Sequence, residues 1–395
     1  MALEEKKPII DHRSSIIDFD QTARVIFGKN TLERLGELAL ELQIRRALLV
    51  TDPGLMKAGH VERALTGLRD AGVEALIFRD VQENPTGRHV EAGVRFAKDH
   101  APIDGIIALG GGSVMDCAKA INFILTNGGK MEDYWGFGKA AKPMLPSLGI
   151  PTTAGTGSEA QSYALISNPE THQKMACGDK KARFRLVILD PALLTTAPKK
   201  VAAIAGIDAI AHAIESYVCT KSNPISQMFA REAWRLLSAN YELVLSHSDD
   251  LEAWGNMQLG AHLAGMAIEN SMLGAAHACA NPLTAHYGIT HGIAVGMMLP
   301  HVIRFNGETV NGYYKDLVES ANLGLGRSSS CADTLSGRIA ELQKLCELPQ
   351  KLRECQVDEK ALPNLAKDAA KQWTGTFNPR PVSEGDFLEL YRQAF

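Results

Sequence analysis

The sequence predicts an α/β domain with a parallel sheet, followed by an all-helical domain. Three observations lead to this prediction. Strand-like apolar segments alternate with helical patterns through the first half of the chain, and glycine-rich turns accompany them. From Pro198 onward the strand patterns fade and long helical patterns take over. Alternation of this kind is typical of a parallel sheet with helices on its faces.

Composition and charge limit the class of protein. The chain has 395 residues, 45% of them hydrophobic and 22% charged, which is enough for two domains with separate cores. A net charge of −4 without a long basic run gives no reason to expect nucleic acid as a partner. Seven scattered cysteines without a CxxC pair indicate a reducing compartment. We see neither a signal peptide nor an apolar run of the about 18 residues that span a membrane. We therefore expect a cytoplasmic protein without a membrane contact.

The first half of the chain contains short apolar segments that end at turn residues, as in Thr51-Asp52-Pro53-Gly54. We expect strands at 24–28, 46–50, 74–78, 103–109 and 186–189, and helices at about 31–42, 59–71, 86–99 and from 114 onward.

A glycine run, Gly110-Gly111-Gly112-Ser113, joins the fourth strand to a helix. Glycines let the backbone approach a ligand, free N–H groups at the helix start point at an anion, and the helix dipole favours negative charge. The turn is not a GxGxxG fingerprint, because Met115 stands where the third glycine would be. By itself it is weak evidence for a phosphate site, since many such turns are only tight turns.

A second loop of small hydroxyl and glycine residues runs from Gly149 to Glu159 and contains Thr152, Thr153 and Ser158. Each loop alone is as compatible with an empty turn as with a ligand, but two together favour a dinucleotide. Asp52 follows a strand, where a carboxylate hydrogen-bonds a ribose 2′-hydroxyl and repels a 2′-phosphate; its alternative role is a turn or helix cap.

The second half is helical, with helices expected at about 200–218, 224–246, 251–268, 270–287 and 291–303. We place the domain boundary near 190, which divides the chain into an α/β domain over 1–190 and a helical domain over 191–395.

The segment from Gly206 to Tyr217 is suited to a buried helix, yet it carries Asp208 and His212 four positions apart. Residues at this spacing share one helical face and can bind the same cation. For an isolated pair, an Asp–His hydrogen bond inside a core is the more common explanation. His277 and His291 change this interpretation, because a helix break at Gly288 allows two helices to direct both rings at the pair. We interpret the four residues as metal ligands.

Three neutral imidazoles and one carboxylate leave about one net positive charge on a divalent ion, which favours binding of an alkoxide. This mixture of ligands suits Fe²⁺, Zn²⁺ or a similar ion. We assign His262, His286 and His301 to packed or solvent-facing positions, and Cys279 to the core as a small apolar residue.

These motifs together resemble the iron-containing (group III) alcohol dehydrogenase family over nearly the full chain. The resemblance lies in residues 110–119, 151–159, 206–217 and in His291-Gly292. It implies a Rossmann-like dinucleotide domain, a helical metal domain and a cleft between them, as in dehydroquinate synthase-like folds. It also implies that Asp208, His212, His277 and His291 hold the metal. The cofactor contacts that it implies are Asp52, Asn84, Gly111, Gly112, Ser113, Asp116, Thr152, Thr153, Ser158 and Lys174.

One position departs from the family pattern. Members similar to lactaldehyde reductase carry a histidine four residues after the third ligand, where this chain has Asn281. Asparagine can hydrogen-bond a substrate but cannot titrate. We place His277, His291 and Asn281 at the reaction centre, and a water chain, a ribose hydroxyl or His286 as substitutes for the missing proton acceptor.

The expected function is reversible hydride transfer between an alcohol and NAD, with NADP less favoured and with Fe²⁺, Zn²⁺ or another divalent ion. The resemblance also leads us to expect a homo-oligomer, a dimer or larger. One alternative is a metal- and NAD-dependent lyase or cyclase of the dehydroquinate synthase type. It needs basic residues for a phosphorylated substrate, and the sequence shows no such cluster around the ligands. Another is a non-catalytic NAD-binding protein, against which the intact ligand set argues.

Overall fold

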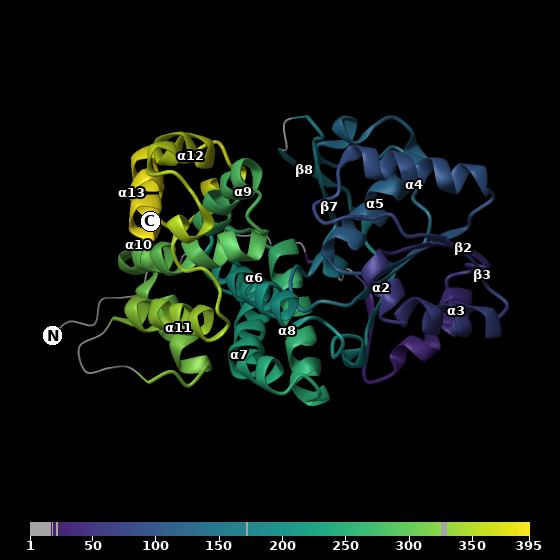
Figure 1. Cartoon of the computed structure of the whole chain (residues 1–395), viewed down its shortest axis with the longest axis horizontal. Helices are drawn as coiled ribbons and strands as arrows, with labels where there is room; N and C mark the ends of the chain where they lie inside the picture. The colour runs from purple at the N-terminus through teal and green to yellow at the C-terminus, as the bar shows by residue number, and fades with distance from the viewer. Residues whose placement is uncertain (1–16, 18, 21–22, 171–172, 325–329) are drawn as a thin grey trace.

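The computed structural model describes the whole chain except residues 1–16, 18, 21–22, 171–172 and 325–329. Its first half is an α/β domain and its second half is a bundle of helices, which lie side by side in Figure 1. The predicted fold class is confirmed.

Six parallel strands form the sheet of the α/β domain in the order β1-β9-β6-β4-β2-β3. They are β1 (Arg24–Phe27), β2 (Arg46–Val50), β3 (Glu74–Phe78), β4 (Gly105–Gly110), β6 (Ser147–Pro151) and β9 (Leu186–Leu189). The central strands β4, β6 and β9 are buried along their whole length, as expected where helices cover both faces of a parallel sheet. The sequence prediction missed β6.

The order of the strands brings the two glycine-rich loops together. Strand β4 pairs with β6, and Gly110 lies opposite Pro151 in their register. Both strands run in the same direction, so both loops leave the sheet at its carboxyl edge. That edge is where ligands bind in open α/β sheets.

Four helices of this domain lie close to where the sequence predicts them: α1 (Leu35–Glu41), α3 (His60–Asp70), α4 (Gly87–Asp99) and α5 (Gly112–Asn127). The short α2 (Pro53–Lys57) was not predicted, because its first residues are typical of a turn. The first predicted helix begins as a 3-10 turn over Thr31–Arg34, because Asn30 adopts a left-handed conformation and gives the helix no side-chain cap.

A small second sheet was also missed by the sequence prediction. It has the order β5-β8-β7 and consists of β5 (Gly136–Phe137), β7 (Tyr163–Ser167) and β8 (Lys174–Gly178). Strands β7 and β8 are antiparallel, and β5 and β8 are parallel.

The second half contains only helices among its described residues. The long ones are α6 (Lys199–Val218), α7 (Pro224–Ser246), α8 (Leu251–Glu269), α9 (Ala275–Tyr287), α10 (His291–Ser320), α11 (Cys331–Leu345), α12 (Leu362–Ala369) and α13 (Glu384–Ala394). The predicted domain boundary near 190 lies between β9 and α6, and it stays a prediction.

Two predicted helices have different bounds. The helix predicted over 270–287 begins only at Ala275, because Gly274 has non-helical backbone angles. The helix predicted over 291–303 continues to Ser320, with a kink at Val310. Buried Tyr314 and Leu317 show why the polar sequence after 303 is still helical, since packing overrides its low local propensity.

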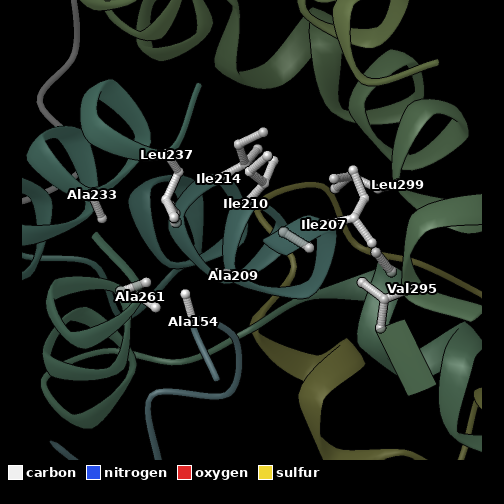
Figure 2. Packing of buried hydrophobic residues seen from close by; sticks show 14 of the residues in the cluster. Ala154, Ile207, Ala209, Ile210, Ile214, Ala233, Leu237, Ala261, Val295 and Leu299 are labelled. Carbon is white, nitrogen blue, oxygen red and sulfur yellow. The ribbon is translucent and has the colours of Figure 1, made fainter. Parts of the chain in front are cut away.

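Helix α6 lies at the centre of the helical domain. Figure 2 shows its Ile207, Ile210 and Ile214 surrounded by side chains of α7, α8 and α10. A helix that is apolar all round is a buried one. By length and composition α6 could cross a membrane, but 83% of its apolar window is buried within the protein, as in a core helix.

Candidate active site

Asp208 and His212 lie on one face of α6, both buried, with 3.7 Å between Asp208 Oδ1 and His212 Nε2. They lie in the middle of this helix, next to Gly155 of the second glycine-rich loop. A Cβ added at Gly155 of that loop would come 2.8 Å from Ala205 of α6, so only glycine permits this approach.

His277 and His291 come from two other helices and meet the α6 pair. His277 lies in the first turn of α9, and its Nε2 is 3.7 Å from Asp208 Oδ1. His291 begins α10, and its ring centroid is 5.4 Å from that of His277. The candidate ligand atoms of Asp208, His277 and His291 all lie within 4.8 Å of one another. This is the convergence that the break at Gly288 predicts.

These atoms fit a divalent cation. Asp208 Oδ1 and His277 Nε2 are buried and have no hydrogen-bond partner among the described residues. A buried carboxylate oxygen or imidazole nitrogen without a partner is costly, and a cation between them removes that cost. The imidazole and carboxylate donors suit a first-row divalent metal.

His212 is beside this group but not within it. Its ring stacks on His277 with 4.8 Å between centroids. The tight cluster consists of the other three residues, so the role of His212 as fourth ligand stays a prediction.

The protonation states of Asp208, His212 and His291 suit metal binding, which requires neutral imidazoles and an ionised carboxylate. Burial lowers the pKa of His212 and, more strongly, that of His291, where nearby Lys174 adds to the effect. Burial alone would raise the pKa of Asp208, but the surrounding histidines hold it below its ordinary value.

Glu215 is a functional residue that the sequence reasoning did not assign. Its buried Oε2 accepts a hydrogen bond of 2.5 Å from Nδ1 of His277. Burial lowers the pKa of His277, but Glu215 and Asp208 outweigh it and raise that pKa to about 9. A carboxylate that holds the outer nitrogen of a metal-binding histidine fixes the tautomer and the ring orientation. The signal was its position in the 206–217 motif, seven residues after Asp208.

Glu215 and Asn378 also hold the start of α9 through hydrogen bonds to its backbone. Glu215 Oε1 accepts a hydrogen bond of 2.7 Å from Ala276 N, and Asn378 Oδ1 accepts one of 3.2 Å from Ala275 N. These two groups satisfy backbone donors that a helix start leaves free. A Cβ at Gly274 would lie 2.9 Å from Glu215 Oε1, so a glycine is needed for this close approach.

The start of α10 is placed by a second close contact. A Cβ at Gly292 would lie 2.3 Å from the carbonyl oxygen of Ile204 in α6. The glycine after His291 therefore lets α10 approach α6 closely enough for His291 to reach Asp208.

The two glycine-rich loops pack against each other at the edge of the sheet. A Cβ at Gly112 would lie 2.5 Å from the Thr156 side chain, and one at Gly111 would lie 3.4 Å from Thr153. Helix α5 has no side-chain cap at Gly111 among the described residues, so its N-terminus presents backbone donors to this edge.

Other predicted cofactor residues lie around this edge. Asp52 caps α2 through Oδ1, which accepts hydrogen bonds from Gly54 N and Leu55 N. The backbone N–H of Asn84 donates to Ser113 Oγ over 3.3 Å, which brings these two candidates together.

Asp116 and Ser158 instead bond to each other. Ser158 Oγ donates to Asp116 Oδ1 over 2.5 Å, and the buried Lys119 donates to the Ser158 carbonyl. Their nearest polar partners are thus internal, and the predicted cofactor contact of this pair stays a prediction.

Two cavities open beside the cluster. One of about 880 Å³ is lined by His277, His291, Asn281 and Lys174. A second, of about 650 Å³, is lined by Asn84, Lys174, Asn281 and His286. Lys174 and Asn281 belong to both, so the two cavities adjoin between the metal cluster and the cofactor edge.

The remaining histidines and Asn281 have protein partners. His262 is buried against Glu159, with 3.0 Å between Nδ1 and Oε1, and His286 pairs with Asp368 on the surface. Burial lowers the pKa of His301 to about 4. Asn281 Nδ2 donates to Gln372 Oε1 over 3.0 Å.

Cys279 is fully buried, as the sequence led us to expect.

The expectation that basic residues do not gather near the ligands is wrong. The sequence showed no basic cluster, but Lys174, Lys180, Arg183 and Lys221 all line the larger cavity. Lys174, Lys180 and Arg183 come from a segment more than 20 residues before Asp208, and Lys221 follows the end of α6, so their convergence requires the tertiary fold.

Comparison with known proteins gives the family. Residues 22–191 match the model "Iron-containing alcohol dehydrogenase", and residues 202–395 match the C-terminal model of the Fe-containing alcohol dehydrogenase family. The chain is 35% identical over 374 residues to 1,3-propanediol dehydrogenase of Citrobacter freundii, which covers 93% of this chain and 96% of that one. It is 30% identical to the NAD-dependent methanol dehydrogenase of Bacillus methanolicus over 93% of this chain and 97% of that one.

A crystal structure of 1,3-propanediol oxidoreductase superposes with a TM-score of 0.92 at 33% identity, covering 96% of this chain and all of that one. The matches span both domains. They therefore include the two glycine-rich loops and the helices that carry the candidate ligands. The resemblance found in the sequence is confirmed, and the chain belongs to the iron-containing alcohol dehydrogenase family of oxidoreductases.

Proposed function

We propose that this protein catalyses the reversible reaction of a primary alcohol and NAD⁺ to an aldehyde, NADH and a proton. The metal site that we propose consists of Asp208, His212, His277 and His291, with Fe²⁺ as the first candidate ion. The observation that supports it best is the pair of unpartnered buried atoms, Asp208 Oδ1 and His277 Nε2, at the side of a cavity large enough for a substrate.

The residues of the chain prepare this site before any substrate arrives. Glu215 accepts the hydrogen bond from Nδ1 of His277, so Nε2 is the nitrogen that faces Asp208 and is left as the candidate metal ligand. Bound NAD supplies the hydride acceptor and a bound divalent metal supplies Lewis-acid polarisation of the hydroxyl oxygen. Burial of the ligand residues excludes bulk water from their side of the site, which strengthens electrostatic interactions there.

The hydroxyl proton has no titrating acceptor at the position next to His277. Asn281 and its partner Gln372 are amides, so they can orient a hydroxyl group but cannot take its proton. The proton passes to water in the cavity or to His286, which lines the adjoining cavity together with Asn281.

The cofactor is NAD in this proposal. The uncapped start of α5 and the two packed glycine-rich loops supply backbone donors for a pyrophosphate. Asp52 uses one carboxylate oxygen as a helix cap, which leaves Oδ2 for a ribose hydroxyl and its charge to repel a 2′-phosphate.

The family assignment favours this oxidoreductase over the lyase and over a non-catalytic NAD-binding protein. The basic residues in the cavity do not reverse this preference, because Arg183 is paired with Glu269 and Asp20, and Lys221 lies over the Phe377 ring.

The test is NAD⁺ reduction by the metal-loaded protein with a panel of primary alcohols. We expect alcohol-dependent NADH formation that His277→Ala abolishes, while that variant still binds NAD through the α/β domain. NADH formation at a near-normal rate by His277→Ala would show that the ligand set is wrong. A metal-loaded protein that binds NAD but forms no NADH with any alcohol would contradict the proposed function.

A further inference from the structure

The small sheet β5-β8-β7 forms one wall of the larger cavity. Side chains on successive residues of a strand alternate between the two faces of the sheet. One face of this sheet is core, made of Ala164, Ile166, Met175 and Cys177. The other face lines the cavity with Tyr163, Leu165, Lys174 and Ala176. A sheet face in contact with water ordinarily carries polar residues. Here three of the four residues are apolar or aromatic, which indicates a surface for an apolar ligand.

Aromatic rings continue this wall across the cavity. Phe137 packs on Tyr163 with 5.6 Å between ring centroids, and Tyr163 faces Trp373 of the helical domain at 6.2 Å. Gly178 makes room for the first pair, because a Cβ there would lie 2.4 Å from the Tyr163 ring and 2.8 Å from the Phe137 ring.

These side chains are open to the cavity despite their size. Phe137 is 52% exposed, Trp373 43% and Leu165 37%. Large apolar side chains gathered in one concave, accessible place mark a ligand site more often than scattered ones do.

The wall extends away from the metal cluster. Lys174 lies at the cluster end of β8, where its charge acts on His291 and Asp208. The register runs from the Ser167–Lys174 pair to the Tyr163–Gly178 pair, four residues or about 13 Å along the strands. A carbon–carbon bond spans only about 1.5 Å, so a three-carbon alcohol held at the cluster leaves the aromatic end in water.

The aromatic end belongs to the substrate side of the site. Of the two cavities, the cofactor candidate Asn84 lines only the smaller one, whereas Phe137, Tyr163 and Trp373 line only the larger one. Two of the basic residues at the larger cavity, Lys180 and Arg183, are paired with carboxylates, and Lys221 lies over the Phe377 ring.

We infer that the substrate is a primary alcohol with a large apolar tail, either aryl-alkyl or medium-chain alkyl, which lies along the face of β7 and β8 and ends between Tyr163 and Trp373. This inference rests on the proposed function and defines its substrate class. It excludes one- to three-carbon alcohols as the best substrates.

The first test compares kcat/KM for ethanol, hexan-1-ol and 3-phenylpropan-1-ol on the metal-loaded protein with saturating NAD⁺. Burial of one methylene group corresponds to a factor of about four. We therefore expect hexan-1-ol to exceed ethanol by on the order of 100-fold. A hexan-1-ol to ethanol ratio near one would overturn the inference and leave the proposed function intact.

A pair of variants locates the tail. Trp373→Ala should lower the kcat/KM ratio of 3-phenylpropan-1-ol to ethanol by about tenfold, since it removes one face of the aromatic site. Trp135 is the matched control, because it is 45% exposed but is not among the described residues that line either cavity. Trp135→Ala should leave the ratio unchanged. Equal changes in both variants would contradict the inference.

The tail site is also testable without turnover. We expect calorimetry with 3-phenylpropan-1-ol and no NAD to give a Kd about tenfold higher for Trp373→Ala than for the wild type. This measurement can be made even if the protein forms no NADH, so it tests the tail site separately from the proposed reaction. Phe137→Ala, on the exposed strand β5, should show the same loss and serves if Trp373→Ala does not fold.

A charged probe tests the role of the basic residues. Butan-1-ol should exceed 4-hydroxybutanoate in kcat/KM, because the wall that we describe is apolar. A tenfold preference for the carboxylate would show that Lys180, Arg183 and Lys221 set the substrate class instead, and it would overturn the inference.

Discussion

At the scale of single residues, Glu215 is the group whose removal is most informative. Glu215→Gln keeps an acceptor for Ala276 N but cannot accept from His277 Nδ1 with its amide nitrogen. The proton of His277 then moves toward Nε2, the atom that faces Asp208. We expect metal affinity to fall about 10- to 100-fold, measured by competition with a chelator of known affinity.

The chain offers a matched control for this variant. Glu159 and His262 form another buried carboxylate–histidine pair, which is not part of the metal cluster. Glu159→Gln should keep metal affinity within about twofold. If both variants bind metal like the wild type, Glu215 does not position His277.

Asp52 is predicted to have two separable roles, as a helix cap and as the residue that selects NAD. Asp52→Ser keeps a capping oxygen and removes the charge. We expect the ratio of kcat/KM for NADP to that for NAD to rise at least about tenfold, since a like charge no longer faces the 2′-phosphate. Asp52→Ala should change the ratio similarly and also lower the free energy of unfolding by about 1 kcal/mol. An unchanged ratio in both variants would remove Asp52 from the cofactor site.

At the scale of elements, the start of α10 depends on its contact with α6. Gly292→Ala would place a Cβ against the Ile204 carbonyl, so α10 must shift and carry His291 with it. We expect a loss of about 1–3 kcal/mol in the free energy of unfolding and at least a tenfold loss of metal affinity. Denaturant unfolding and metal titration measure the two effects.

Gly337 provides the control for this change. It lies inside α11, and a Cβ there meets nothing within 4 Å. Gly337→Ala should leave metal affinity unchanged and stabilise the helix by up to about 1 kcal/mol. Equal metal affinity in both alanine variants would mean that the contact of α10 with α6 does not place His291.

Elements with strong periodicity were predictable, and short ones were not. Strands β4 and β9 and the helices of the second half have apolar patterns that local sequence reveals, whereas β6, with Ser147, Gly149 and Pro151, does not. Strands β7 and β8 have only five residues each, and their largely apolar cavity face breaks the alternation of apolar and polar residues expected of a half-exposed strand. The start of α9 was placed too early because its caps, Glu215 and Asn378, come from distant parts of the chain.

In the candidate site, too, features set by local sequence were predictable and features set by contacts between distant segments were not. The spacing of Asp208 and His212 on one helix is local, so the sequence predicts it directly. We inferred from a helix break at Gly288 that the side chains of His277 and His291 lie near Asp208, and the structure confirms that both do. The contact of Glu215 with His277 and that of Tyr163 with Trp373 join residues more than 50 positions apart, which no local pattern contains.

At the scale of the whole molecule, the metal cluster joins three helices and faces the cofactor edge of the other domain. Asp208 comes from α6, His277 from α9 and His291 from α10. A metal bound by all three links these helices at one point, in addition to their packing and to the hydrogen bonds between Glu215 and the start of α9. The central claim is therefore that one divalent ion binds per chain at this point, and that everything else in the site is arranged around it.

Anaerobic titration of metal-free protein with Fe²⁺, with Zn²⁺ in parallel, tests this claim most directly. We predict saturation at about one ion per chain. Asp208→Asn and His277→Ala should each remove this binding while circular dichroism shows the helices intact. No bound ion at the end of the titration, or wild-type affinity in both variants, would contradict the account.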